Sequence, residues 1–379
     1  MRTWARVAQG DTPPAVLSGL VAESIGNQTI RQHLSVSAGG RALRFRFSNE
    51  YSDKPLSIGC ASVGMVAEGT VEADKTYPVT FNGRPSVAIP AGAFVLSDAI
   101  ELRVRPLQEL QVNLFFPETT AIFDGSAMSV LQDISVSAAG DFTKSTRMPM
   151  VERSASRRIL TGVDVLSPER GKVVVALGDS ITAGNAVDIG WPSYLARRVN
   201  GSIAVVNAGI GGNQLLRNGF GDGALVRFGR DVLAVPGVTH VVVLVGINDI
   251  GLPGVSIVGG GDWIPLSALP TLDAMILAYT QLAARAHDVG LKIYIGMLTP
   301  FQGAPAGYHS PQKEALRQAV NRWIRTSGVF DAIVDFEAAL QSPSARESMS
   351  PHYDAGDHLH PNSEGQKALA DSVDLSLFE

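Results

Sequence analysis

The sequence predicts two structural units: an antiparallel β-sandwich or jelly roll, then an α/β unit built on a doubly wound parallel sheet. The first observation behind this prediction is that apolar and polar residues alternate over roughly the first 140 residues. The second is that continuous apolar runs, separated by helical stretches, follow from about residue 171. Alternation is typical of strands with one solvated face, whereas continuous apolar runs are typical of parallel strands covered on both faces.

Three segments of the first unit show the alternation most clearly. They are TIRQHLSVS (29–37), RALRFRF (41–47) and ELQVNLFF (109–116). Between two further short apolar stretches lies Asn82-Gly83, a dipeptide that is common in two-residue hairpin turns. Short antiparallel strands at this spacing predict a β-sandwich or jelly roll.

The second unit contains five apolar runs that we expect to form parallel strands. These runs are KVVVAL (172–177), SIAVVN (202–207), HVVVLV (240–245), KIYIGML (292–298) and AIVDF (332–336). Helical stretches are expected between them at 191–200, 222–234, 271–289 and 311–326. Strands and helices that alternate in this way predict a doubly wound α/β sheet.

The charged segment 143–158 has almost no apolar periodicity, so it marks the expected transition between the two units. We therefore predict a β-rich domain over residues 1–150, a linker over 151–170 and an α/β domain over 171–379. The glycine-rich segment 251–263 directly follows a predicted strand and is expected to form a loop over the site.

Composition and charge exclude several classes of protein. The net charge of −5 and the pI near 5.8 argue against a nucleic-acid partner and against an anionic membrane surface. No apolar run approaches the roughly 20 residues that a membrane span needs. Cys60 is the only cysteine, which excludes an intrachain disulfide and a cysteine-based metal site.

The N-terminal residues lack the apolar core of a signal peptide, so a cytoplasmic location is expected, or a periplasmic or secreted one if a leader has been removed. The sequence leaves the oligomeric state open.

Polar residues cluster in four short motifs of the second unit. These are GDSIT (178–182), GIGGN (209–213), GIND (246–249) and DHLHP (357–361). The first three directly follow predicted strands, and ligands of open α/β sheets bind beyond the carboxyl ends of the strands. The fourth precedes a C-terminal helix, whose start is predicted by Ser363 and Gln366 as a capping box.

The residue types in these motifs suit acyl transfer. A serine such as Ser180 is a poor nucleophile until a base takes its proton, and histidine is the usual base near neutral pH. Asp357 lies three residues before His360, so its carboxylate can hold the imidazole in the required tautomer and complete a catalytic triad. An oxyanion hole would be formed by the side-chain amide of Asn248 and the backbone N–H groups of Gly212 and Ser180.

In this order, the four motifs resemble the four sequence blocks of the SGNH, or GDSL, hydrolase family, over roughly residues 172–379. The family is named for a serine, a glycine, an asparagine and a histidine. Carried over block by block, these correspond to Ser180, Gly212, Asn248 and His360, with Asp357 completing the triad.

Two positions depart from the family pattern. Ile181 replaces the leucine of GDSL, and Gly211 stands where many members have serine. Neither change removes a reacting group.

The resemblance implies a flavodoxin-like sheet and no metal or other cofactor. The two-domain layout also resembles the arylesterase and acetylxylan-esterase-like branch of the family.

The resemblance implies a serine ester hydrolase that acts on a small-molecule or carbohydrate ester. We expect it to cleave short-chain esters, chiefly acetyl esters, through an acyl-enzyme on Ser180. The alternatives are a carbohydrate-binding protein with a vestigial hydrolase domain and a longer-chain lipase. The absence of a long apolar lid in the sequence disfavours the lipase.

Several polar and aromatic residues near the motifs have more than one interpretation. His358 could join Asp357 and His360 as a metal ligand, but no further histidine or carboxylate cluster shows ligand spacing. We therefore expect His358 to be exposed or to support the site from outside. Asp179 and Asp249 are expected to orient backbone near the site rather than to react. The aromatic side chains of the loops, which include Trp263 and Tyr308, could line a pocket or pack internally, and no role is predicted for them.

Overall fold

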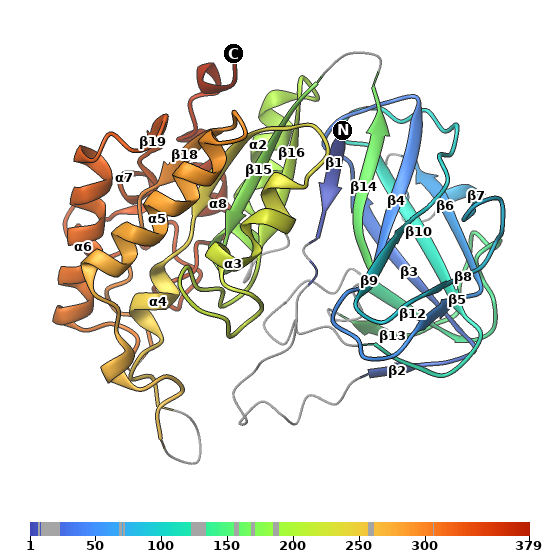
Figure 1. The fold of residues 1–379 in the computed structure, drawn as a ribbon, viewed down its shortest axis with the longest axis horizontal. Coiled ribbons are helices and arrows are strands. Elements are labelled where there is room, and N and C mark those ends of the chain that lie inside the picture. Colours follow the sequence, from blue (N-terminus) through green and yellow to red (C-terminus); the bar gives the residue numbers. More distant parts are fainter. Residues whose placement is uncertain are drawn as a thin grey trace.

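The β-rich unit and the α/β unit lie side by side in the computed structural model (Figure 1). The structure describes residues 1–6, 8, 23–67, 70, 73–122, 134–154, 159–167, 171–184, 189–256, 261–305 and 307–379.

The β-rich unit is made of antiparallel strands arranged in several sheets. Its strands in the described ranges are β1 (Arg2–Ala5), β2 (Glu23–Ile25), β3 (Gln28–Ser35), β4 (Ala42–Asn49), β5 (Leu56–Ile58), β6 (Cys60–Val66), β7 (Ala73–Val79), β8 (Val87–Ile89), β9 (Ala93–Leu96), β10 (Glu109–Phe116), β11 (Thr120–Ile122), β12 (Ile134–Ala139), β13 (Met150–Ser154) and β14 (Leu160–Leu166). One sheet has the order β1-β14-β4-β9 and a second has the order β13-β12-β3-β10-β6-β7. Two pairs, β11-β2 and β5-β8, complete the unit.

The alternating pattern of β10 places its apolar side chains in the core of the β-rich unit. Leu110, Val112 and Leu114 are buried there. The polar side chains on the opposite face are also buried, because the chain after β12 covers them. Asn113, for example, accepts a hydrogen bond from Arg31 Nε at 2.8 Å, and Arg31 also donates to the backbone carbonyls of this covering segment. This face is therefore packed rather than solvated.

The α/β unit contains a five-stranded parallel sheet in the described part of the chain. Its strands are β15 (Lys172–Gly178), β16 (Ile203–Gly209), β17 (Val238–Leu244), β18 (Lys292–Gly296) and β19 (Ala332–Val334). Their order is β16-β15-β17-β18-β19, which is the 2-1-3-4-5 order of flavodoxin-like folds. The predicted fold class is confirmed.

Helices cover both faces of the sheet, which explains why the strands are continuous apolar runs (Figure 1). They are α1 (Ser180–Ala183), α2 (Trp191–Val199), α3 (Ala224–Phe228), α4 (Ile247–Gly251), α5 (Leu272–His287), α6 (Pro311–Thr326), α7 (Phe336–Leu340) and α8 (Ser363–Asp371). Shorter helical turns are the π-helical η2 (Gly229–Leu233) and the 3₁₀ segments η3 (Leu266–Ala268) and η4 (Leu375–Phe378). Helix α2 packs against α8, whereas α5 packs against α3 and α6.

The segment 151–170 differs from the linker expected there. Its described part contains β14, which pairs with β4 and β1 inside a sheet of the β-rich unit. Leu160, Val163 and Val165 are buried in that unit's core. The strand escaped the sequence analysis because Gly162 interrupts its apolar run and coincides with a shift in the β4–β14 register.

The two units meet along β1 and β16 (Figure 1). The backbone N–H of Val205 in β16 donates to Ser37 Oγ at 3.0 Å, and the backbone N–H of Arg2 donates to the Pro236 carbonyl at 2.9 Å. These contacts fix one unit against the other through buried hydrogen bonds as well as through apolar packing.

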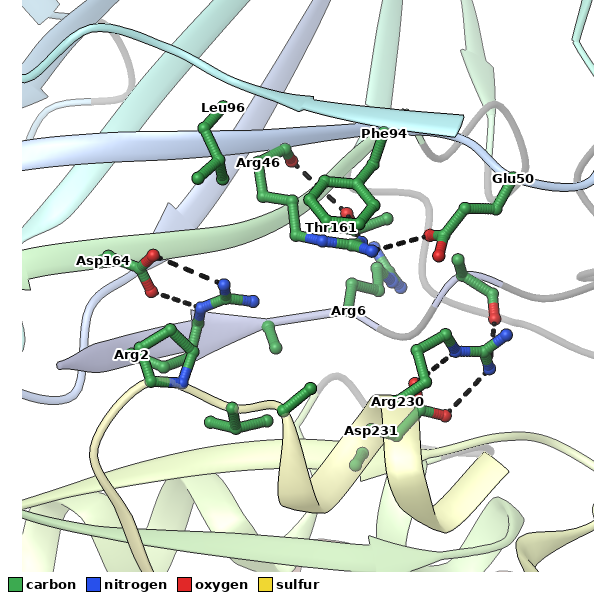
Figure 2. Close-up of a pocket in the computed structure, with 16 residues that line it drawn as sticks. Arg2, Arg6, Arg46, Glu50, Phe94, Leu96, Thr161, Asp164, Arg230 and Asp231 are labelled. Carbon is green, nitrogen blue, oxygen red and sulfur yellow. Dashed lines mark hydrogen bonds and ion pairs between the residues drawn. The ribbon is translucent and has the colours of Figure 1, made fainter. Parts of the chain in front are cut away.

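A cavity of about 250 Å³ lies at this junction (Figure 2). Arginine side chains form much of its wall, and several of them pair with carboxylates. Arg2 contacts Asp164, and Arg230 Nε lies 2.6 Å from Asp231 Oδ1. The guanidinium of Arg46 stacks on an exposed phenylalanine ring of β9 at 3.9 Å. The described lining includes none of the predicted catalytic residues, so this cavity is distinct from the candidate site.

Candidate active site

Ser180 lies at the carboxyl end of β15, where the chain turns into the short helix α1. Asp179 caps this helix, and its carboxylate accepts a hydrogen bond from the Ile181 backbone N–H at 3.0 Å. The pKa of Asp179 is raised to about 7, chiefly because the side chain is buried, although the hydrogen bond from Ile181 opposes the shift. The cap therefore fixes the backbone on both sides of Ser180, as expected for Asp179.

His360 joins Ser180 to Asp357. The imidazole Nε2 lies 2.9 Å from Ser180 Oγ, and the imidazole Nδ1 lies 2.6 Å from Asp357 Oδ2. The three predicted triad residues are therefore brought together in a hydrogen-bonded chain. Both ring nitrogens have a partner, and this pairing sets the orientation of the ring.

The carboxylate of Asp357 also organises the loop that carries His360. Asp357 Oδ1 accepts hydrogen bonds from the backbone N–H groups of Leu359 at 3.0 Å and His360 at 2.8 Å. Burial alone would raise the pKa of Asp357, but the hydrogen bonds from the His360 ring and backbone outweigh it and hold the pKa well below its usual range. The carboxyl group consequently stays ionised near neutral pH, as an acid that orients a histidine must.

His358 lies apart from this chain of contacts. Its Nδ1 is 2.6 Å from Asp354 Oδ2, and its side chain is 56% exposed. Its backbone has a φ of 60°, which is unusual for a residue with a side chain. Asp357 and His360 are engaged with each other and with Ser180, so these residues do not converge with His358 on one point as metal ligands would.

Gly212 lies in a tight turn after β16 with a φ of 70°. A Cβ at this position would be 2.4 Å from the ring of Phe220, which packs directly on the glycine. Both the backbone conformation and the close ring therefore require glycine here. Phe220 in turn contacts Trp263 edge to face, with the ring centroids 4.6 Å apart.

Asn248 lies in α4, just beyond the carboxyl end of β17. Its Nδ2 donates to the Asn213 carbonyl at 2.9 Å, and its Oδ1 accepts from the Tyr308 hydroxyl at 2.8 Å. These two contacts fix the orientation of the amide. They also place Asn248 against the residue that follows Gly212, so the two predicted oxyanion donors belong to one hydrogen-bonded cluster.

Tyr308 is a site residue to which the sequence analysis gave no role. Its phenol is buried, and burial raises its pKa well above the usual value, so the hydroxyl remains a donor to Asn248. Lys313 holds the loop that carries Tyr308: its Nζ donates to the carbonyls of Gly307 at the loop and Gly251 at the end of α4. Tyr308 lies 60 positions from Asn248 in the sequence, and no local pattern predicts the pair.

Asp249 orients backbone, as expected. Its carboxylate accepts from the backbone N–H groups of Leu215 at 2.6 Å and Leu216 at 2.9 Å. Burial raises its pKa to about 6, against the effect of these two hydrogen bonds. The contacts tie the start of α4 to the loop after β16.

Arg227 is a second buried residue that the sequence analysis did not identify. Its guanidinium donates to the carbonyls of Gly178 at 2.9 Å and Ala208 at 2.8 Å, which lie at the ends of β15 and β16. It also donates to Asn213 Oδ1 at 3.1 Å. In the sequence it resembles an ordinary helical arginine, but it connects the two strand ends with the loop that follows Gly212.

The capping box predicted for α8 is wrong. The N-cap is Asn362, whose side chain accepts from the Gly365 backbone N–H at 3.0 Å. Gln366 is instead fully buried, and its side chain contacts the backbone of α1 and α2. Its Oε1 accepts from the Trp191 backbone N–H at 2.7 Å, and its Nε2 donates to the Ile181 carbonyl at 3.0 Å. Gln366 therefore links the helix after His360 to the helix that begins at Ser180.

Within the described ranges, no group of three or more histidine, cysteine, aspartate or glutamate side chains is arranged to hold a metal ion. No helix in those ranges is both long enough and apolar enough to cross a bilayer.

Comparison with known proteins places the site region in one family. The model of the GDSL-like lipase/acylhydrolase family matches residues 176–368, which include all four motifs. No curated protein matches the chain in sequence.

Solved structures resemble about half of the chain. A GDSL-like lipase from Bacteroides thetaiotaomicron VPI-5482 is 18% identical, with 53% of this chain and 85% of that chain covered and a TM-score of 0.39. A lipase/acylhydrolase from Enterococcus faecalis is 17% identical, with 53% and 92% covered and a TM-score of 0.39. An acetylxylan esterase from Geobacillus stearothermophilus is 21% identical, with 53% and 91% covered and a TM-score of 0.38.

Proposed function

The chain belongs to the GDSL-like lipase/acylhydrolase family and is a carboxylic ester hydrolase; on this premise we propose that it cleaves short-chain acyl esters, chiefly acetyl esters, through an acyl-enzyme on Ser180. The observation that carries the proposal is the hydrogen-bonded chain from Ser180 through His360 to Asp357. A serine is activated when a general base lies within hydrogen-bond reach and a third group orients that base.

The first half of the reaction forms the acyl-enzyme. His360 Nε2 takes the proton of Ser180 Oγ as the oxygen attacks the ester carbonyl carbon. Asp357 stabilises the imidazolium that results. His360 then donates this proton to the leaving alcohol oxygen, so that the ester C–O bond breaks and the acyl group stays on Ser180.

The second half of the reaction releases the acyl group. His360 takes a proton from water, the hydroxyl attacks the acyl carbon, and the proton returns to Ser180 Oγ as the carboxylic acid leaves. In both halves, the backbone N–H groups of Ser180 and Gly212 and the amide of Asn248 would donate to the oxyanion. Tyr308 supports this role because it holds the acceptor end of the Asn248 amide.

The preference for short acyl chains is argued from the surroundings of Gly212. Phe220 packs on the glycine, and Trp263 packs on Phe220, so an aromatic pair occupies the space beside the proposed oxyanion hole. Trp263 belongs to the segment 251–263, which has five glycines among its 13 residues. A longer acyl tail would therefore bury little apolar surface, at about 0.8 kcal/mol per buried methylene.

One substrate series tests this proposal. Chromogenic esters from acetate to laurate would be assayed beside acetylated xylan and monosaccharide acetates, with Ser180→Ala as the blank. We expect kcat/KM to be highest for acetate to butyrate and to fall at octanoate. A steady rise from acetate to laurate would instead indicate a lipase. Binding of glycans without any Ser180-dependent turnover would indicate a carbohydrate-binding protein whose hydrolase domain is vestigial.

A further inference from the structure

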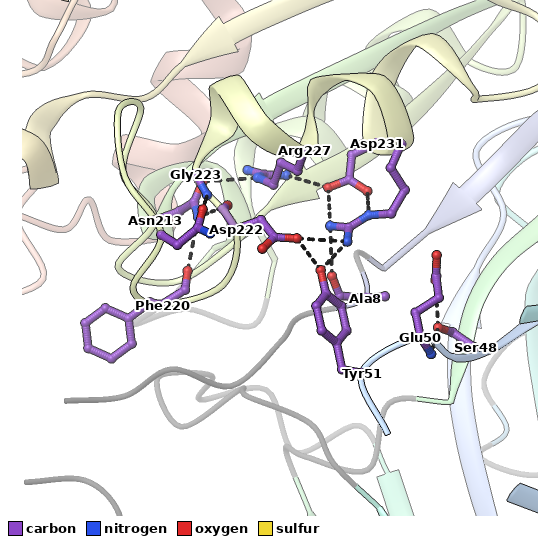
Figure 3. Close-up of polar contacts among 12 residues, drawn as sticks. Ala8, Ser48, Glu50, Tyr51, Asn213, Phe220, Asp222, Gly223, Arg227 and Asp231 are labelled. Carbon is purple, nitrogen blue, oxygen red and sulfur yellow. Dashed lines mark hydrogen bonds and ion pairs between the residues drawn. The ribbon is translucent and has the colours of Figure 1, made fainter. Parts of the chain in front are cut away.

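A hydrogen-bonded contact between the two units ends at the loop that follows Gly212. Tyr51 lies just after β4 in the β-rich unit, and its hydroxyl donates to Asp222 Oδ2 at 2.5 Å. Arg230 Nη1 donates to the same hydroxyl and lies 3.2 Å from Asp222 Oδ2. Figure 3 shows Tyr51 directed from the β-rich unit toward Asp222 in the α/β unit. The contact joins positions that are 171 residues apart.

The Tyr51 hydroxyl is a neutral donor over the working pH range. Burial raises the pKa of Tyr51 to about 12, and the hydrogen bond to Asp222 adds to this effect. The hydroxyl therefore keeps its proton near neutral pH and donates it to the Asp222 carboxylate, while its oxygen accepts from Arg230.

The backbone carbonyl of Asp222 connects this contact to the side chain of Asn213. Asn213 Nδ2 donates to the carbonyls of Asp222 at 2.8 Å and Phe220 at 3.0 Å, and Asn213 Oδ1 accepts from Arg227 Nε at 3.1 Å (Figure 3). The Asn213 side chain is fully buried. Its own carbonyl accepts from Asn248 Nδ2 at 2.9 Å, and the residue before it is Gly212. Asn213 is therefore in contact with one proposed oxyanion donor and adjacent in sequence to the other.

A second connection runs in parallel with the first. The guanidinium of Arg230 donates to both carboxylate oxygens of Asp231, at 2.6 and 2.9 Å, and Asp231 Oδ2 accepts from Arg227 Nη1 at 3.2 Å. Arg230 also donates to the Ala8 carbonyl at 3.1 Å. Two points of the β-rich unit, Tyr51 and Ala8, thus contact the cluster that holds the loop.

We propose that Tyr51 is a positioning residue for the oxyanion hole, so that the β-rich unit holds the 212–223 loop in its active geometry. This inference rests on the proposed function, because it assigns Tyr51 a role in the same reaction. Tyr51 would act through Asp222 and Asn213 on the placement of the Gly212 N–H and the Asn248 amide. Such an effect appears in the transition state, where the oxyanion carries charge, and not in the binding of the uncharged ester.

The variant Tyr51→Phe removes the hydroxyl and keeps the ring. We expect kcat for a short-chain aryl ester to fall about tenfold, with KM changed by less than about twofold, because small misplacements of catalytic groups have large effects on rate. A boronic acid that forms a tetrahedral adduct with the nucleophile mimics the oxyanion, and its affinity should fall by about the same factor as kcat/KM.

Two control variants separate positioning from general loosening of the structure. Tyr294→Phe makes the same chemical change at a buried tyrosine of β18 whose hydroxyl contacts the Leu377 carbonyl. Ser37→Ala removes a different hydrogen bond between the two units, the one to Val205. Both variants are expected to keep kcat within about twofold of the parent, because neither contact leads to the 212–223 loop.

A double-mutant cycle with Asn248→Ala gives the decisive readout. If Tyr51 acts through the oxyanion donors, the Tyr51→Phe change should cost less in kcat once Asn248 is already alanine than the roughly tenfold it costs in the parent, because only the route through Gly212 then remains. Full additivity of the two changes, an unchanged kcat in Tyr51→Phe, or an effect on KM alone would each overturn the positioning role. If the parent protein itself shows no Ser180-dependent ester hydrolysis, the proposed function fails first, and this outcome is distinct from the other three.

Discussion

His360 Nε2 lies 2.9 Å from Ser180 Oγ, although the two residues are 180 positions apart in the sequence. The contact exists because Ser180 follows the end of strand β15 and His360 lies in the loop before α8, and both lie at the carboxyl edge of the sheet. Gln366 of α8 also connects this helix to α1, because its side chain donates a hydrogen bond to the Ile181 carbonyl. The sheet and the last helix together set the distance between Ser180 Oγ and His360 Nε2.

The two histidines of the DHLHP motif should differ sharply in their effect on activity. His360→Ala should lower kcat by about 10⁴-fold or more, because members of a triad act as a unit. His358→Ala should change kcat by less than about threefold, since this side chain is exposed and paired with Asp354. Steady-state kinetics of the two purified variants test the pair. A larger loss in His358→Ala would show that the general base is not His360.

Asn248→Ala should lower kcat by about 10²–10³, which corresponds to roughly 3–4 kcal/mol for one missing oxyanion donor. KM should change little, because the donor is directed at charge that develops only in the transition state. The measurement is kcat and KM for an acetate ester over a full range of substrate concentration. A variant with normal kcat and a raised KM would show that Asn248 binds substrate and does not stabilise the oxyanion.

Tyr308→Phe should reduce kcat by about tenfold, which is less than the effect of Asn248→Ala, because the amide keeps its contact to the Asn213 carbonyl. The Asn248 side chain would lose the hydrogen bond at its oxygen and gain freedom to rotate. Combining the two substitutions should cost no more than Asn248→Ala alone. If Tyr308→Phe keeps full activity, the hydroxyl has no part in orienting the amide.

The buried carboxyl of Asp179 predicts a dependence of stability on pH. Its folded-state pKa is about 7, above the ordinary value of 3.8, so the folded protein binds this proton more tightly than the unfolded chain does. The resulting stabilisation is complete below about pH 4 and is lost as the pH rises to about 7. Asp179→Asn keeps an acceptor for the Ile181 N–H and removes the titration.

Denaturant unfolding of the parent and of Asp179→Asn, at several pH values between 4 and 8, measures this effect. The free energy of unfolding of the variant should rise relative to the parent across that interval. A difference between the two proteins that stays constant with pH would show that Asp179 does not change its proton affinity on folding.

The parallel strands of the α/β unit and the residues of the proposed triad were predictable because their signals are local. Runs such as 172–177 are apolar throughout, since helices cover both faces of the sheet. Ser180 and His360 stand in short motifs whose residue types have a chemical meaning of their own. The alternation of strands and helices predicts a doubly wound sheet, whereas its flavodoxin-like order is what the family resemblance implies.

Other features depend on contacts between distant parts of the chain, and no local pattern carries them. Tyr308 and Arg227 look like ordinary loop and helix residues until the fold places them against Asn248 and Asn213. The strand β14 was missed for a different reason. Its partners β1 and β4 are far away in the sequence, and Gly162 interrupts the alternation of apolar and polar residues within the strand.

The central claim is that Ser180 is the nucleophile, and covalent labelling tests it most directly. The protein would be treated with an organophosphate, and the site and number of adducts would be found by intact-mass and peptide mass spectrometry. We predict one adduct on Ser180, no adduct and no ester hydrolysis in Ser180→Ala, and greatly slowed labelling in His360→Ala. An adduct on another serine, or ester hydrolysis that survives in Ser180→Ala, would contradict the account.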